Sequence, residues 1–99
     1  MANYFVYQFV PHRPDFPADL TETETAVMQE HFGYWQTQAD KGVAVVYGPV
    51  GDPAGTWGLA VVEADSEEEV AAIRGGDPVI KSDLGRVNIY PMLNTIIRS

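Results

Sequence analysis

The chain has 99 residues, no cysteine and a formal net charge of −8 at pH 7. This length fits one domain with a single modest core, and the composition is that of a globular protein. The lack of cysteine excludes disulfide bonds and thiolate chemistry. The acidic balance, with only six basic residues, argues against nucleic-acid binding. No export signal and no bilayer-spanning apolar run is visible, so we expect a cytoplasmic protein without membrane association.

The first half of the chain predicts a strand, a loop and a helix. Residues 3–10 are rich in aromatic and β-branched side chains, which favour a strand. The segment 11–17 carries three prolines and is predicted to form a loop of restricted freedom. Thr21 and Glu24 form a capping box that starts a helix ending near residue 40. Along this helix an apolar stripe recurs every four residues, and it contains His31.

The second half predicts a hairpin, a second helix and a last strand. Residues 43–50 and 56–64 are apolar strands, joined by a turn rich in glycine and proline. Ser66, with glutamate three residues later, caps a helix over 67–74. Asp77 precedes a proline and caps a short helical turn that reaches about residue 83. A strand over 86–93 and a tail over 94–99 complete the single domain predicted for residues 1–99.

The order of elements, βαββαβ, predicts an α+β ferredoxin-like sandwich in which two helices cover one face of a four-stranded antiparallel sheet. The second strand is apolar on both faces: simple alternation places Val45 and Tyr47 on one side, and Ala44 and Val46 on the other. Two helices can shield only one face. We therefore expect a homodimer through the open sheet face, a dimeric α+β barrel; an exposed apolar face in a monomer is the alternative.

Several short motifs together resemble the YCII-related (YciI-like) family. The resemblance extends over about 28–92 and rests on the order and spacing of five segments: residues 31–35 (HFGYW), 41–42 (KG), 47–49 (YGP), 66–69 (SEEE) and 77–79 (DPV). The chain departs from the family pattern in its longer 11–20 segment and in Val79, which stands where an aromatic residue is more usual.

The resemblance implies a ferredoxin-like dimer whose members share a histidine on the first helix and an aspartate before a proline. These positions fall on His31 and Asp77, which would form a catalytic pair. The family is similar in fold to muconolactone isomerases, and at least one member is a dehalogenating enzyme of aromatic catabolism. Fold similarity alone is a weak guide to reaction type.

The chemistry of the two residues fits such a pair. Histidine exchanges protons near neutral pH, and an ionised aspartate beside it orients the ring and raises its basicity. Each residue also has a purely structural explanation, because His31 lies in a packed helical stripe and Asp77 can cap the following turn. We expect five residues to bind the substrate: Tyr7, Trp35, Tyr47, Gly48 and Pro49.

Two classes of function remain open at this stage. The first is a cofactor-independent enzyme, an isomerase, lyase or dehalogenase that transfers a proton on a small cyclic or aromatic metabolite. The second is a non-catalytic protein that binds or presents such a small molecule. No spacing of histidine and acidic residues resembles a metal motif, so we expect no metal and no cofactor.

Overall fold

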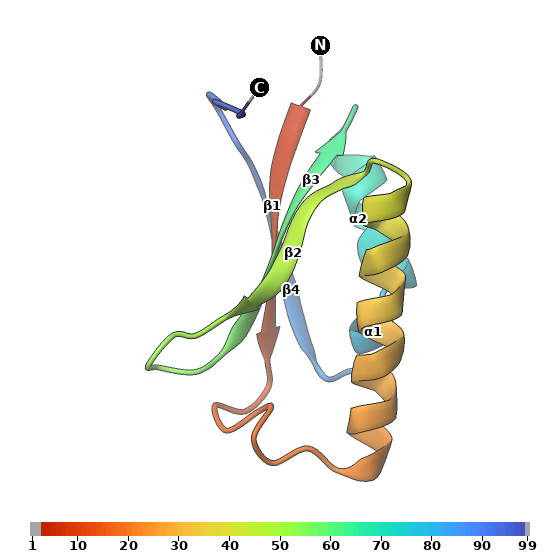
Figure 1. Cartoon of the computed structure of the whole chain (residues 1–99), viewed down its shortest axis with the longest axis vertical. Helices are drawn as coiled ribbons and strands as arrows, with labels where there is room; N and C mark the ends of the chain where they lie inside the picture. Colours follow the sequence, from red (N-terminus) through yellow and green to blue (C-terminus); the bar gives the residue numbers. More distant parts are fainter. Residues whose placement is uncertain (1–2, 99) are drawn as a thin grey trace.

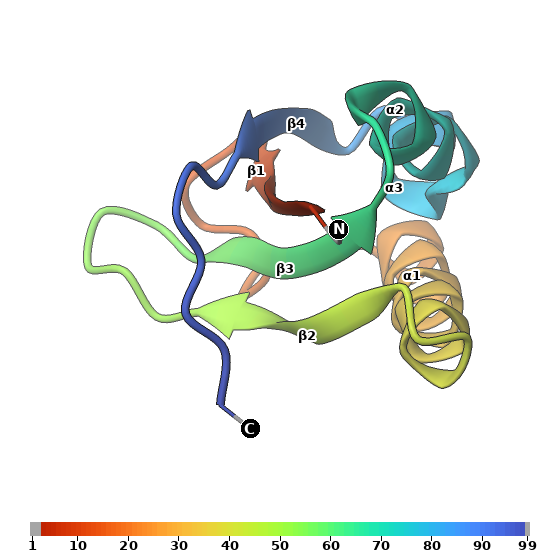
Figure 2. The ribbon, with the colours of Figure 1, turned by 90° about the horizontal axis from the view of Figure 1, so that it is seen from above.

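The computed structural model describes residues 3–98 of the chain. The elements follow one another as β1 (Asn3–Pro11), α1 (Glu22–Asp40), β2 (Ala44–Val50), β3 (Trp57–Ala64), α2 (Glu67–Gly76), α3 (Pro78–Lys81) and β4 (Gly85–Pro91). The four strands form one antiparallel sheet in the order β2-β3-β1-β4. All three helices pack on the same face of the sheet (Figures 1 and 2). The predicted ferredoxin-like α+β fold is thus confirmed.

The helix starts agree with the capping signals in the sequence. Thr21 accepts a hydrogen bond from the backbone N–H of Glu24, and the Glu24 carboxylate accepts one from the backbone N–H of Thr21. Ser66 likewise accepts from the backbone N–H of Glu69. These bonds satisfy N–H groups that a helix leaves without internal partners. They therefore determine where α1 and α2 begin.

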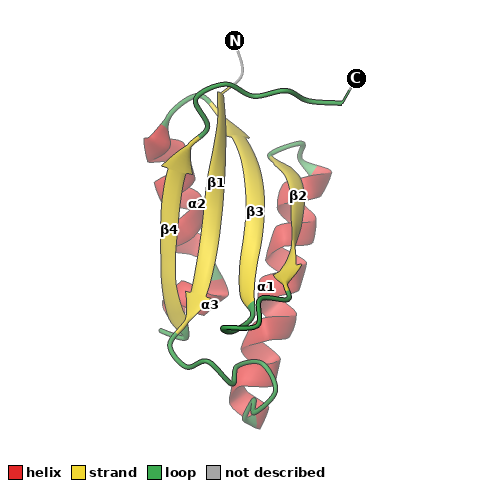
Figure 3. Ribbon diagram, turned by 90° about the vertical axis from the view of Figure 1, so that its left-hand side faces the viewer, coloured by secondary structure: helices red, strands yellow, loops and turns green. Residues whose placement is uncertain are grey.

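The core lies between the sheet and the helices, and alternation in the central strands selects the side chains that enter it. In β1, Phe5, Tyr7 and Phe9 are buried, while the residues between them face the other side. In β3, the buried positions include Ala60 and Val62. The other face of the sheet carries no helix (Figure 3).

The second strand departs from simple alternation. A register shift between Ala44 and Val46 in the β2–β3 pairing marks a β-bulge at Val45. Before the bulge Ala44 pairs with Val62, and after it Tyr47 pairs with Ala60, so both face the helices. The expectation that Tyr47 and Ala44 point to opposite faces was therefore wrong, because one extra residue reverses the pattern that follows it.

The last strand ends earlier than predicted. β4 stops at Pro91, which has no backbone N–H to continue the ladder, although Met92 N–H still bonds to Tyr4 C=O at 2.9 Å. The following residues run across the ends of the strands (Figure 3). Of the predicted tail, residues 94–98 form no helix or strand, and Ser99 lies outside the described residues.

Candidate functional site

Asp77 lies at the sharp junction between α2 and α3 and is fully buried. It is the N-cap of α3: its Oδ1 accepts the backbone N–H of Val79 at 3.1 Å, and Pro78 occupies the first helical position. The capping role expected from the sequence is therefore present. It also aims the carboxylate toward α1 and β1.

Four donors surround this carboxylate. Besides the Val79 N–H, Oδ1 faces His31 Nδ1 at 2.6 Å. The other oxygen, Oδ2, accepts the Tyr7 hydroxyl at 2.7 Å and the Trp35 indole N–H at 2.9 Å. The cap and the histidine thus share one oxygen, while two aromatic side chains occupy the other. Together the four donors hold the carboxylate in one orientation.

This set of donors determines where the protons are. The Trp35 N–H and the backbone N–H of Val79 can only donate, and the Tyr7 O–H donates to Oδ2, so an ionised Asp77 is favoured. Burial alone would raise the pKa of Asp77, but the hydrogen bonds from His31, Tyr7 and Trp35 outweigh it and leave the pKa below its usual range. In the neutral form of the His31 imidazole the proton therefore resides on Nδ1, and Nε2 is left as a hydrogen-bond acceptor.

The free nitrogen of His31 meets Tyr47. His31 is fully buried on the inner face of α1, and its Nε2 hydrogen-bonds to the hydroxyl of Tyr47 in β2. Because Nε2 is the acceptor, the Tyr47 O–H donates. Burial, and next the negative charge of Asp77, raise the pKa of Tyr47, so the phenol remains neutral. The result is a hydrogen-bonded chain from Asp77 through His31 to Tyr47.

Tyr47 is held in place from three sides. Its ring stacks on Trp35, with centroids 5.3 Å apart and planes 10° from parallel. The bulge at Val45 turns it toward the helices. Its hydroxyl lies over Gly58 of β3, where a Cβ atom would come within 2.9 Å of the tyrosine oxygen. Only glycine leaves room for the hydroxyl at this position.

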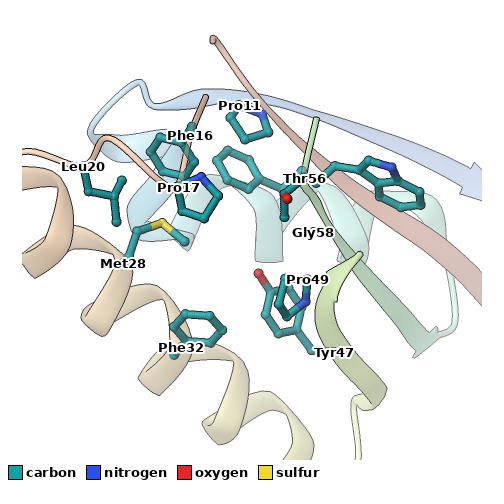
Figure 4. A pocket seen from close by; sticks show the side chains of 12 residues that line it. Pro11, Phe16, Pro17, Leu20, Met28, Phe32, Tyr47, Pro49, Thr56 and Gly58 are labelled. Atoms are coloured by element: carbon teal, nitrogen blue, oxygen red, sulfur yellow. The ribbon is translucent and has the colours of Figure 1, made fainter. Parts of the chain in front are cut away.

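An apolar pocket lies next to Tyr47, and His31 is not among its lining residues. Its volume is about 130 Å³, and the end of β1, the loop before α1, the helix α1 and strands β2 and β3 form its walls (Figure 4). The lining residues are Phe9, Pro11, Phe16, Pro17, Leu20, Met28, Phe32, Tyr47, Pro49, Thr56, Trp57 and Gly58. Among these lining residues, only Tyr47, Thr56 and Trp57 carry a side-chain oxygen or nitrogen. In Figure 4 the Tyr47 hydroxyl points into the middle of this group of side chains.

The structure divides the predicted site residues into two groups. Tyr47 and Pro49 line the pocket, and Gly48 does not. Tyr7 and Trp35, each 1% exposed, do not line the pocket and instead donate hydrogen bonds to Asp77. His31 and Asp77 are brought together, but neither lines the pocket.

None of the loop residues that form one wall of the pocket was among the site residues named from the sequence. Phe16, Pro17 and Leu20 belong to the segment that departs from the family pattern. Arg13 anchors it: its guanidinium bonds to the carboxylates of Asp19 at 2.9 Å and Glu24 at 2.7 Å. The large apolar residues Phe16 and Leu20 in this loop were the available signal, because such side chains are more often buried than exposed.

Other candidate sites are less developed. His12 is exposed and pairs with Asp83 at 3.0 Å, away from His31. Within residues 3–98, no three histidine, cysteine or acidic side chains gather as a metal site would require. In the same range no helix has the length and apolar character needed to cross a membrane.

The fold and the site define a ferredoxin-like α+β protein with a buried carboxylate–imidazole pair beneath an apolar pocket. The chain belongs to the YCII-related family, whose domain model matches residues 7–93. This confirms the family resemblance. The chain is also similar to a solved structure, the 5-chloro-2-hydroxyhydroquinone dehydrochlorinase TftG of Burkholderia phenoliruptrix in complex with 2,5-dihydroxybenzoquinone. The TM-score is 0.65 at 19% identity, with 87% of this chain and 89% of that chain covered. No curated protein matched the sequence.

Proposed function

We propose that this protein is an acid–base enzyme that transfers a proton on a small cyclic or aromatic metabolite without a cofactor. The observation that carries this proposal is the hydrogen-bonded chain Asp77–His31–Tyr47, which ends at the wall of an apolar pocket. His31 is the proton acceptor and donor, and Asp77 orients it and stabilises the imidazolium form. The likeness to TftG, which acts on a hydroquinone, supports an aromatic or quinonoid substrate.

The reaction types that fit are isomerisation and elimination. Both begin with removal of a proton from an O–H or C–H group of the substrate. In isomerisation the proton returns to another atom of the ring, and in dehydrochlorination the electron pair expels chloride. The apolar lining excludes water from the site and favours a neutral, flat ligand.

The test is turnover of a defined panel followed by a histidine substitution. 5-Chloro-2-hydroxyhydroquinone, scored by chloride release, and muconolactone, scored by absorbance, sample the two reaction types. We expect His31→Ala to lower kcat by at least about 100-fold, which is the usual contribution of general acid–base catalysis. His12→Ala, at the exposed histidine, is the matched control, and His31→Asn replaces His31→Ala if the latter does not fold.

The alternative is a binding protein that holds such a molecule without converting it. A binding protein would have the same pocket and the same ligand as the enzyme, so binding alone does not separate the two functions. Binding of 2,5-dihydroxybenzoquinone with no product from any panel compound, and with only its affinity altered in His31→Ala, would favour the alternative.

We propose further that two chains associate through the open sheet face. Apolar side chains remain on this face, among them Val46 and Tyr90, each 53% exposed, and Leu59 and Val61 lie between them on β3. Such a patch is unusual in a monomer. Light scattering at micromolar concentration is expected to give twice the mass of one chain. Val61→Lys is expected to give one chain, whereas Gln29→Lys, on the exposed side of α1, leaves the dimer intact.

A further inference from the structure

Tyr47 stands between the pocket and the histidine, and this position raises a question of access. His31 is 0% exposed and does not line the pocket, and both of its ring nitrogens already have partners. A molecule in the pocket therefore contacts the Tyr47 side chain and not the imidazole. Any proton that passes between the two must cross the tyrosine hydroxyl.

We propose that Tyr47 is a catalytic residue that relays the proton between a pocket-bound ligand and His31. This inference rests on the proposed function of the same site. In this arrangement the Tyr47 phenol contacts the ligand, and His31, which does not, accepts the relayed proton. The ligand it selects is one that presents an O–H or an acidic C–H to a neutral phenol in apolar surroundings.

The relay balances as two coupled transfers. The ligand releases a proton to the Tyr47 oxygen and keeps the electron pair of the broken bond. At the same time the original hydroxyl proton of Tyr47 passes to His31 Nε2, so Tyr47 is a neutral phenol before and after the step. The imidazolium that forms is stabilised by Asp77 through the Nδ1–H bond, and Asp77 remains ionised.

The geometry fits this direction of transfer. The Tyr47 hydroxyl donates to Nε2 of the neutral imidazole, and its oxygen retains lone pairs that can accept a proton. The stacked Trp35 ring and the small Gly58 hold the oxygen between the two partners. A free phenolate at Tyr47 is not required, which agrees with the raised pKa of this group.

A competing arrangement is a tyrosine that merely covers the histidine and swings aside when the ligand binds. Phenylalanine would cover and move equally well but cannot relay a proton. Tyr47→Phe therefore separates the two arrangements. Tyr4→Phe is the matched control, because Tyr4 is partly buried in β1, where it pairs with Glu63 near the other end of the strand.

The first measurement is turnover of whichever panel compound the wild-type protein converts. We expect Tyr47→Phe to lower kcat by about 100-fold or more, with KM changed less than about threefold. Tyr4→Phe keeps the wild-type kcat. A Tyr47→Phe protein with wild-type kcat would overturn the relay and leave the function of His31 standing.

The second measurement needs no turnover and so separates this inference from the proposed function. 4-Nitrophenol, whose ionised form is yellow, is titrated into protein labelled with ¹⁵N at histidine. In the wild type, binding is expected to produce the phenolate absorbance and to shift Nε2 of His31 to a protonated signal. Tyr47→Phe is expected to bind the probe within about threefold and to show neither change. A probe that does not bind the wild type, or that ionises equally in Tyr47→Phe, overturns the proposal.

Discussion

The ring of Tyr47 in β2 stacks on the indole of Trp35 in α1, and the same indole donates its N–H to Asp77. Trp35 therefore supports both ends of the hydrogen-bonded chain that includes His31. It is 1% exposed and also meets Tyr7 edge to face at a centroid distance of 4.7 Å. A single side chain thus couples the packing of the core to the geometry of the site.

Trp35→Phe is expected to destabilise the protein by about 3 kcal/mol, because it removes a hydrogen bond to a buried carboxylate and leaves part of the indole volume empty. Chemical denaturation measures the change. Trp57→Phe is the control, because the Trp57 indole bonds to Asp52 at 3.1 Å at an exposed position. We expect it to cost less than about 1 kcal/mol. Equal losses in the two variants would contradict a special role for the Trp35–Asp77 bond.

Asp77→Asn is expected to destabilise the protein by about 2–4 kcal/mol at neutral pH. The asparagine amide would place N–H groups where one carboxylate oxygen now accepts hydrogen bonds, so buried donors would face each other without an acceptor. Asp83→Asn is the control. Asp83 is an exposed aspartate at φ 54°, a conformation that asparagine adopts readily, so a change of less than about 0.5 kcal/mol is expected. A similar change in both variants would show that the four bonds to Asp77 contribute little.

The stability of the wild type is expected to depend on pH through the same carboxylate. The pKa of Asp77 is lower in the folded chain than in the unfolded chain, where aspartate titrates near about 3.9. The contribution of Asp77 is therefore complete above that value and is lost as the pH falls through the folded pKa. Denaturation curves between pH 7 and pH 2 should show a weaker acid dependence in Asp77→Asn than in the wild type.

Much of the fold could be predicted from the sequence because local signals acted in agreement. The capping signals at Thr21 and Ser66 predicted where α1 and α2 begin, and the apolar, β-branched and aromatic composition of residues 3–10 and 56–64 predicted β1 and β3. The pairing of His31 with Asp77 came from the family resemblance, since the two lie 46 residues apart. Spacing alone does not report such a contact.

What could not be predicted depended on tertiary structure. The bulge at Val45 reverses the face of Tyr47, and no residue type at that position signals it. Tyr7 and Trp35 were expected at the ligand, but their polar atoms bond to Asp77 because the buried carboxylate requires donors. Tyrosine and tryptophan each combine an apolar ring with one polar group, so they can line a ligand pocket or pack in the core. The sequence could not decide between these two placements.

Gly58→Ala is expected to displace the hydroxyl of Tyr47 from His31, because the added Cβ atom would lie within 2.9 Å of it and 3.4 Å from Phe9 Cβ. The ring is confined by Trp35, so the hydroxyl cannot move without loss of its hydrogen bond. Turnover should fall by about 10-fold or more, as is common when a reacting group is misplaced. Gly51→Ala adds the same atom where nothing lies within 4 Å, and it should leave turnover and folding unchanged. Wild-type activity in Gly58→Ala would show that the position of the Tyr47 hydroxyl is not critical.

Arg13→Ala is expected to release the loop that forms one wall of the pocket. Arg13 joins this loop to α1 through Glu24, and its guanidinium lies 5.4 Å above the ring of Phe16, a buried pocket residue. Amide hydrogen exchange at Phe16 and Ala18 should become about 10-fold faster, because local opening no longer breaks these contacts. Arg86→Ala, at an exposed arginine of β4, is the control and should leave this exchange unchanged.

The same variant can be checked through the titration of Glu24. The hydrogen bonds from Arg13, and next the one from the Thr21 backbone, lower the pKa of Glu24 to about 2. Because the folded pKa is depressed, the ion pair contributes above the unfolded value near about 4.3 and is lost as the pH falls toward 2. An NMR titration of the Glu24 carboxyl should therefore move toward about 4 in Arg13→Ala and remain near 2 in Arg86→Ala. A Glu24 carboxyl that titrates alike in all three proteins would show that Arg13 does not hold the loop to α1.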